Sequence, residues 1–151
     1  MSKKVTMVLG AQFGSEAKGL ICGYMAEQNG YDCAMTAFTP SAGHTHINAE
    51  GRKWVHTQLA LSIVSPNMKT VLIGPGSVVH LDNLVAEVLG SIDIIREKRI
   101  RICIHPHAAM VMDYHRTKEQ LTMVGIGSTQ KGGGAAIAEK LARQPDARII
   151  A

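Results

Sequence analysis

Short apolar runs alternate with helical patterns along this chain, and that alternation predicts an α/β fold. Four runs are expected to form strands, at Val5–Leu9, Cys33–Phe38, Thr70–Ile73 and Ile100–Ile104. Apolar residues recur every three or four positions in Lys18–Gln28, Asp82–Lys98 and Ala135–Ala142, which are expected to be helices. Strands that alternate with helices usually pair in parallel through right-handed crossovers. We therefore expect a mostly parallel central sheet with flanking helices.

The segment from His46 to Leu59 departs from this alternation and predicts an antiparallel hairpin. Asn48-Ala49-Glu50-Gly51 supplies residues typical of a tight turn, and Trp54 is the aromatic residue of the second strand. No repeat, low-complexity tract or linker interrupts the chain. A single domain spanning residues 1–151 is therefore the simplest organisation.

The segment Gly10–Gly19 follows the first apolar run and contains Lys18. A loop between a strand and a helix presents free backbone N–H groups, and with a lysine it can bind phosphate. The common nucleotide-binding loop has glycine before its lysine and serine or threonine after it, but Ala17 and Gly19 occupy those places. A phosphate site and a structural turn with a surface lysine both remain open on the pattern alone.

Two further loops contain residues suited to binding or catalysis. Pro40–Thr45 follows the run Cys33–Phe38, so it would lie at the carboxyl edge of the sheet, where α/β folds bind ligands. His44 is either an ordinary loop histidine or a group facing the phosphate loop. The glycines at 132–134 are either a flexible connector or a loop whose amides bind phosphate at a helix start.

Composition narrows the class of protein. With 46% hydrophobic residues, 151 residues can bury one core, and a net charge of +4 suits phosphate-bearing ligands. Aromatic residues are only 4%, and no basic stripe or long apolar run occurs, so we expect neither nucleic-acid nor membrane binding. Three cysteines without paired spacing are expected to be small core residues in a reducing, cytoplasmic compartment. No carboxylate or cysteine completes a zinc site around His44 and His46 or around His105 and His107.

The loops together resemble the adenylosuccinate synthetase family, in which a GDEGKG-type loop and an NAGHT-type loop meet over a purine nucleotide. Gly127–Gly134 is similar to the family's GTTGKG-type substrate loop, and Glu139–Arg143 to the helix that follows it. The order and spacing agree across nearly the whole chain. The similarity is closest to the phage branch, the 2-aminoadenylosuccinate synthetases, which share Asn29–Asp32 and Ile47–Trp54. The resemblance implies a P-loop-NTPase-like synthetase fold that is incomplete at the C-terminus, because family members are much longer.

The resemblance also implies a reaction. A carbon–nitrogen ligase of this family transfers the γ-phosphoryl group of ATP or GTP to the purine 6-oxygen, and the amine of L-aspartate then displaces the phosphate at C6. The phage branch implies dGMP as the purine substrate. An ordinary synthetase acting on IMP and a non-catalytic nucleotide-binding remnant are the two alternatives. Mg²⁺ is the expected cofactor, and the expected location is the cytoplasm, that of a bacterial host if the chain is phage-encoded.

The family's functional residues carry over onto matching positions of this sequence. Catalytic groups are Ser15, Lys18 and His44, with His44 as acid towards the 6-oxygen. Nucleotide phosphates would be held by Gly14, Ser15, Glu16, Ala17, Lys18, Gly19, Gly43, His44 and Thr45, and the metal by Ser15 and the Gly43 carbonyl. The purine nucleotide would be held by Ser41, Ala42, Ser128, Thr129, Gln130 and Arg143. Arg143 would come from the second subunit of a homodimer and hold the 5′-phosphate together with Thr129.

Three residues depart from the family pattern. Ala17 replaces a loop glycine, so a left-handed backbone there would cost roughly 1 kcal/mol or more. Ser41 replaces an asparagine and shortens a substrate contact. Ser15 replaces the aspartate that removes the N1 proton and binds Mg²⁺ in most of the family, and a hydroxyl is a weaker base and ligand. Because the shorter side chain leaves room for a 2-amino group, Ser15 favours dGMP over IMP.

Overall fold

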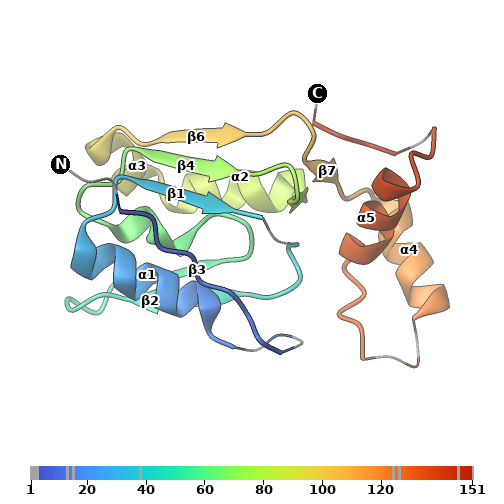
Figure 1. The fold of residues 1–151 in the computed structure, drawn as a ribbon, viewed down its shortest axis with the longest axis horizontal. Helices are drawn as coiled ribbons and strands as arrows, with labels where there is room; N and C mark the ends of the chain where they lie inside the picture. The colour runs from blue at the N-terminus through green and yellow to red at the C-terminus, as the bar shows by residue number, and fades with distance from the viewer. Residues whose placement is uncertain are drawn as a thin grey trace.

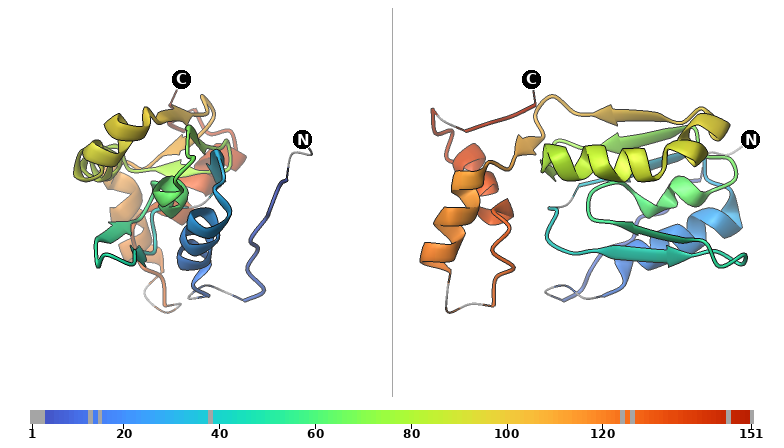
Figure 2. Two further views of the ribbon diagram at one scale, coloured as in Figure 1. Left: turned by 90° about the vertical axis from the view of Figure 1, so that its left-hand side faces the viewer. Right: turned by 180° about the vertical axis from the view of Figure 1, so that it is seen from behind.

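A computed structural model describes residues 4–12, 14, 16–37, 39–123, 125, 127–145 and 147–150. The chain forms an α/β body and a pair of helices beyond one end of its sheet (Figure 1). The helices and strands of the body surround one main core, and α4 and α5 are the last two elements in the sequence (Figure 2). No helix within the described ranges is long and apolar enough to cross a membrane.

The central sheet is parallel, as the alternation of strands and helices predicts. Its strands are β1 (Cys33–Thr36), β4 (Thr70–Ile73) and β6 (Arg101–Ile104), in the order β1-β4-β6. Cys33 pairs with Thr70, which pairs with Arg101. Val71 in the central strand is completely buried because strands flank it on both sides and the core covers its side chain. Phe38, the last residue of the second predicted strand, lies outside the described residues.

The prediction of a first strand at Val5–Leu9 is wrong for this structure. Residues 4–10 carry no strand, and the side chains of Val5, Met7 and Leu9 are 87%, 74% and 76% exposed. A strand needs a neighbour to accept its backbone hydrogen bonds and a layer to cover its apolar side chains. No strand within the described part of the chain pairs with this segment.

The predicted hairpin is confirmed. Strands β2 (His44–Ile47) and β3 (Lys53–His56) pair antiparallel, with His46 opposite Trp54. Gly51 has φ +79° in the turn, a backbone conformation that glycine adopts without strain. Trp54 is buried, and the Arg52 guanidinium lies 4.9 Å from its ring centroid. The hairpin lies beside α1 (Lys18–Asn29), the predicted first helix, which ends at Gly30.

The long helix predicted at Asp82–Lys98 is two helices, α2 (Leu81–Gly90) and α3 (Ile92–Lys98). Ser91 separates them with φ −112° and ψ 13°, outside helical geometry. The Ser91 hydroxyl lies 2.9 Å from Nε2 of His56 in the neighbouring hairpin, and this buried contact fixes the break. The apolar spacing continues across Ser91, so the pattern alone could not reveal the change of direction.

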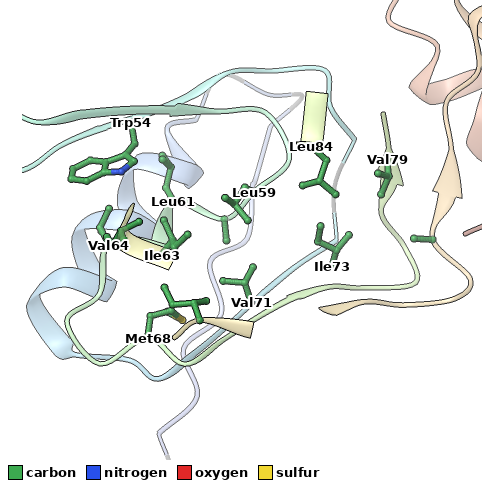
Figure 3. Packing of buried hydrophobic residues seen from close by; sticks show 14 residues of the cluster. Trp54, Leu59, Leu61, Ile63, Val64, Met68, Val71, Ile73, Val79 and Leu84 are labelled. Carbon is green, nitrogen blue, oxygen red and sulfur yellow. The ribbon is translucent and has the colours of Figure 1, made fainter. Parts of the chain in front are cut away.

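Several elements were not anticipated from the sequence. These are the 3₁₀ helix η1 (Leu61–Val64), the short parallel strands β5 (Val78–Val79) and β7 (Ala109–Met110), and helix α4 (Asp113–Thr122). Helix α5 (Gly133–Leu141) begins two residues before the predicted Ala135. The core under the sheet brings η1 and β4 together with Trp54 and Leu84 (Figure 3).

The cysteines are not core residues as expected. Cys33 and Cys103 are exposed and Cys22 is only partly buried. Cys33 and Cys103 alternate with Ala34, Ile102 and Ile104, which pack against the core on the opposite face of the sheet. Side chains that alternate along a strand point to opposite faces, so a thiol on the outer face stays accessible.

Candidate functional site

The loop before α1 forms a cradle for a negatively charged group. The backbone N–H groups of Ala11 and Gln12 each donate to Oε1 of Glu16 at 2.6 Å, and the Lys18 ammonium forms an ion pair with Oε2. A Cβ atom at Gly10 would collide with the Glu16 carboxylate and lie 2.8 Å from Lys18 Nζ. Two amides and an ammonium therefore converge on one carboxylate, which shows that this loop can bind an anion.

The charge of the cradle acts on Glu16 itself. The hydrogen bond from Lys18 and those from the Gln12 and Ala11 amides lower the pKa of Glu16 below its usual value, although partial desolvation opposes them. The carboxylate therefore stays ionised and holds the donors of the loop. The Glu16 side chain is 15% exposed, so this carboxylate is partly accessible to solvent where it meets the donors of the loop.

The backbone of the loop has the left-handed turn expected at Ala17. Ala17 has φ +55° and ψ 20° at the start of α1, and Gly14 has φ +118°. An alanine in this conformation costs about 1–2 kcal/mol relative to glycine. Ser15, predicted as a catalytic and metal-binding residue, lies outside the described residues.

The second predicted loop approaches the first at His44. This residue begins β2, is half-buried, and packs against Gly19 of α1. Desolvation lowers the pKa of His44, and the Lys18 ammonium lowers it further, while the Glu87 carboxylate partly opposes them. The structure therefore brings His44, the first residue of β2, together with Lys18 and Gly19, the first two residues of α1. Gly43 and Thr45 flank His44 and are exposed.

Ser41 lies beside the start of α5. Its hydroxyl is 2.9 Å from the Thr39 hydroxyl, and a Cβ atom at Gly133 would be 3.5 Å from it. The start of α5 thus adjoins the loop that carries Ser41 and Ala42. The loop between α4 and α5 lies on the same side of the molecule as the loop before α1 (Figures 1 and 2).

Residues 132–134, for which a connector and a phosphate-binding helix start are the two predicted roles, lie where a side chain contacts the backbone amides. Glu119 of α4 accepts hydrogen bonds from the backbone N–H groups of Gly132 at 2.7 Å and Ala135 at 3.0 Å. Glu119 is 3% exposed, so this contact is part of the buried structure. The preceding residues remain accessible: Thr129 is exposed, and Ser128 Oγ accepts from the Gln130 N–H at 3.1 Å.

Arg143 lies at the far end of α5, exposed and with φ +50°. Glu139, one turn earlier, is buried and accepts hydrogen bonds from His115 at 2.8 Å, Lys118 at 3.1 Å and Tyr114 at 3.1 Å. Burial would raise the pKa of Glu139, but these three donors outweigh it and lower the pKa. Glu139 therefore joins α4 to α5, while Arg143 faces solvent.

Sequence reasoning missed two buried side chains of α4, Glu119 and His115. Helix α4 is mostly polar, so it lacked the apolar repeat that reveals a helix. No group of three histidine, cysteine, aspartate or glutamate residues among the described positions could hold a metal ion. A hollow of about 300 Å³ lies between β3 and α2, lined by Trp54, His56, Glu87 and Ser91, and contains none of the predicted site residues.

Comparison with known proteins places these loops in a family. Residues 7–150 match the family model for adenylosuccinate synthetase. An N6-succino-2-amino-2'-deoxyadenylate synthase of Acinetobacter phage SH-Ab 15497 is 48% identical over 99% of this chain and 38% of its own length. The synthase of the same name from Salmonella phage PMBT28 is 50% identical over 96% of this chain and 39% of its own length. The chain thus spans about two fifths of the length of these curated relatives.

Solved structures agree with this match. The succinoaminodeoxyadenylate synthetase of Cyanophage S-2L, bound to dGMP and dATP, superposes with a TM-score of 0.79 at 34% identity, over 91% of this chain and 38% of that chain. The fully ligated adenylosuccinate synthetase of Plasmodium falciparum gives a TM-score of 0.70 at 25% identity, over 89% of this chain and 32% of that chain. Both support the mixed α/β fold with a parallel sheet.

Proposed function

Because the chain belongs to the adenylosuccinate synthetase family, we propose that it forms the phosphate-binding, amino-terminal part of an ATP- or GTP-dependent carbon–nitrogen ligase. The reaction joins L-aspartate to C6 of dGMP, a step towards a diaminopurine deoxynucleotide. The convergence of Lys18, two loop amides and His44 carries this proposal. The relatives named N6-succino-2-amino-2'-deoxyadenylate synthase and the S-2L structure with dGMP and dATP support the substrate.

In this proposal the cradle binds the triphosphate. The amides of Ala11 and Gln12 and the Lys18 ammonium exchange the Glu16 carboxylate for phosphate oxygens, which carry more charge. The rest of the phosphate-binding loop includes Gly14, Ala17 and Gly19. The phosphates would also lie next to Gly43 and Thr45, the two neighbours of His44 in sequence. The protein contributes position and charge neutralisation, which are the main needs of phosphoryl transfer.

His44 is the group that acts on the purine 6-oxygen. Its lowered pKa favours the neutral imidazole, which donates a hydrogen bond to the oxygen as charge develops there. Lys18 is the adjacent charge that both depresses this pKa and attracts the phosphate being transferred. The two residues therefore act on the two ends of the bond that forms.

Mg²⁺ fits this site only as an ion held mainly by phosphate oxygens. The cradle offers no cluster of carboxylates within the described ranges, and Mg²⁺ commonly uses few protein ligands and several phosphate or water oxygens. The Gly43 carbonyl and the Ser15 hydroxyl are the proposed protein ligands. When bound, the ion would neutralise charge on the phosphates.

Ser15 selects the purine in this proposal. The 2-amino group of guanine lies beside N1, and a serine leaves space for it and an oxygen that accepts its hydrogens. We expect kcat/KM to be higher for dGMP than for IMP. Ser15→Asp should reduce the use of dGMP without necessarily creating the use of IMP.

Thr129 and Arg143 hold the nucleotide 5′-phosphate, with Arg143 supplied by the second subunit of a homodimer. Ser41, Ala42, Ser128 and Gln130 border the purine nucleotide. The exposure of Thr129 and Arg143 supports a role towards a ligand outside the described core. In a two-fold dimer each site borrows the same residue. Mixing Arg143→Ala chains with His44→Ala chains should therefore restore activity above either mutant alone, and no recovery would refute sharing.

Turnover assays test the proposal directly. The protein is incubated with Mg²⁺, L-aspartate, ATP or GTP, and either dGMP or IMP, and the succinyl adduct is measured by mass spectrometry. We expect adduct from dGMP, and His44→Ala should lower kcat roughly 100-fold while nucleotide binding changes little. Preference for IMP would identify an ordinary synthetase. Nucleotide binding without adduct from either purine would identify a binding module.

A further inference from the structure

Two glycines of α1 pack against two histidines of β2. A Cβ atom at Gly19 would lie 2.5 Å from Nδ1 and 2.6 Å from Cβ of His44. At Gly23 it would lie 3.0 Å from Nδ1 and 3.3 Å from Cγ of His46. Each imidazole therefore occupies the space that a side chain on the helix would fill.

The distance between Gly19 and Gly23 along the helix is close to the distance between His44 and His46 along the strand. Four residues advance about 6 Å along an α-helix, and two residues advance about 6.6 Å along a strand. Gly19 and Gly23 share one helix face, and His44 and His46 share one strand face. Gly19 therefore lies opposite His44 when Gly23 lies opposite His46. The two contacts together align α1 with β2.

The His46 pair anchors this alignment. His46 is 3% exposed, and its Nε2 lies 3.4 Å from Oε2 of Glu27, which stands one helical turn beyond Gly23. The ring centroid of His46 is 6.1 Å from that of Trp54 on the paired strand. Neither nitrogen of this ring makes a hydrogen bond within the described residues, so close packing between α1 and Trp54 is what restricts its movement.

The His44 pair lies at the end of this contact that faces the phosphate loop. Lys18 precedes Gly19, so the helix that seats the ring also carries the ammonium beside it. The clash at Gly19 involves His44 Cβ as well as the ring. Rotation of the imidazole alone cannot relieve that clash, and a substitution must shift the start of β2.

We propose that Gly19 is the positioning residue for His44, and that the packing of His46 on Gly23 fixes the register that keeps the two aligned. Glycine is thus required at position 19 by the imidazole as well as by any phosphate. The catalytic role of His44 in this inference rests on the proposed function. The packing itself and its test need no nucleotide.

The position of the His44 ring tests the proposal. At one fixed pH and without nucleotide, we compare the unmutated chain with Gly19→Ala by nuclear Overhauser cross-peaks between the imidazole protons of His44 and the backbone protons of residue 19. The unmutated chain should show these cross-peaks, because a Cβ atom at Gly19 would touch the His44 ring. Because the added methyl group displaces the ring, Gly19→Ala should weaken them, while the cross-peaks between His46 and Gly23 should persist.

Gly90→Ala is the matched control. Gly90 is also a helical glycine, but no atom lies within 4 Å of a Cβ built there, so its replacement should leave the His44 cross-peaks unchanged. Unchanged His44 cross-peaks in Gly19→Ala would overturn the proposal. So would an equal change in Gly90→Ala, because the effect would then come from the helix in general.

Unfolding measurements cover the case in which Gly19→Ala folds poorly. Alanine normally stabilises a helix relative to glycine. A clash with His44 would therefore make Gly19→Ala lower the stability of the protein instead of raising it. Gly19→Ala should lower the urea midpoint of the unmutated chain but raise or preserve that of a His44→Gly chain, which lacks both the ring and Cβ. The same loss in both chains would contradict the proposal. Since neither measurement involves nucleotide, failure of dGMP turnover would leave this result standing.

Discussion

Two loops of this protein lead into a helix through a left-handed residue, and each holds a carboxylate on its backbone amides. Before α1, Ala17 has φ +55° and Glu16 accepts from Ala11 and Gln12. Before α5, Gly132 has φ +83° and Glu119 accepts from Gly132 and Ala135. The local chemistry is the same in both loops.

The two carboxylates differ in origin and burial. Glu16 belongs to its own loop, pairs with Lys18 and partly faces solvent. Glu119 comes from a different helix and is 3% exposed. A fully buried carboxylate on buried amides cannot leave without exposing polar groups to an apolar surrounding, whereas the partly exposed carboxylate of Glu16 can be replaced by another anion from solvent. The first loop is therefore suited to a ligand and the second to joining α4 with α5.

Removing the buried carboxylate should have the largest effect. Glu119→Ala leaves the N–H groups of Gly132 and Ala135 without their acceptor, so we expect a loss of about 3 kcal/mol in the free energy of unfolding. Urea denaturation followed by circular dichroism measures this loss, and Glu16→Ala is the matched control, expected to change stability little. Similar losses for the two variants would show that the loops do not differ as described.

Exchanging alanine and glycine at the two left-handed positions should give changes of opposite sign. Gly132→Ala strains the backbone and places Cβ 2.9 Å from His115 Cβ, so we expect destabilisation by about 2 kcal/mol. Ala17→Gly relieves strain at an exposed position and should stabilise by about 1 kcal/mol. Thermal unfolding midpoints compare both variants with the unmutated protein. A stabilising Gly132→Ala, or a destabilising Ala17→Gly, would contradict the assignment of strain.

Replacing the partly exposed carboxylate, Glu16, should give the smallest effect, which is measured as a change in anion binding. Glu16→Gln weakens the internal competitor for Lys18, so inorganic tripolyphosphate should bind about threefold more tightly by isothermal titration calorimetry. Lys18→Ala is the control and should weaken binding. If Glu16→Gln weakens binding as Lys18→Ala does, Glu16 organises the cradle and does not compete with its ligand.

The sequence by itself determined the local elements that carry a strong signal. The apolar runs at Thr70–Ile73 and near Ile100–Ile104 and the helical repeat after Lys18 are confirmed as β4, β6 and α1. The turn residues Asn48–Gly51 were sufficient to predict the hairpin. The positive φ of Ala17 was also expected, because the loop motif places a glycine there in the family. These features depend on backbone propensity and on the period of apolar residues, which neighbours in sequence specify.

Tertiary structure decided the rest, because contacts across the chain outweigh local preference. The apolar run Val5–Leu9 is exposed and pairs with no strand among the described residues, and the helical repeat is interrupted at Ser91, where this residue contacts His56. The amides of Gly132 and Ala135 bind the Glu119 carboxylate because the packing of α4 places that side chain at the start of α5, and the sequence pattern of α4 gave no sign of this contact. The seat of His44 on Gly19 likewise needed both the helix and the strand, since only their packing brings a glycine and an imidazole to the same place.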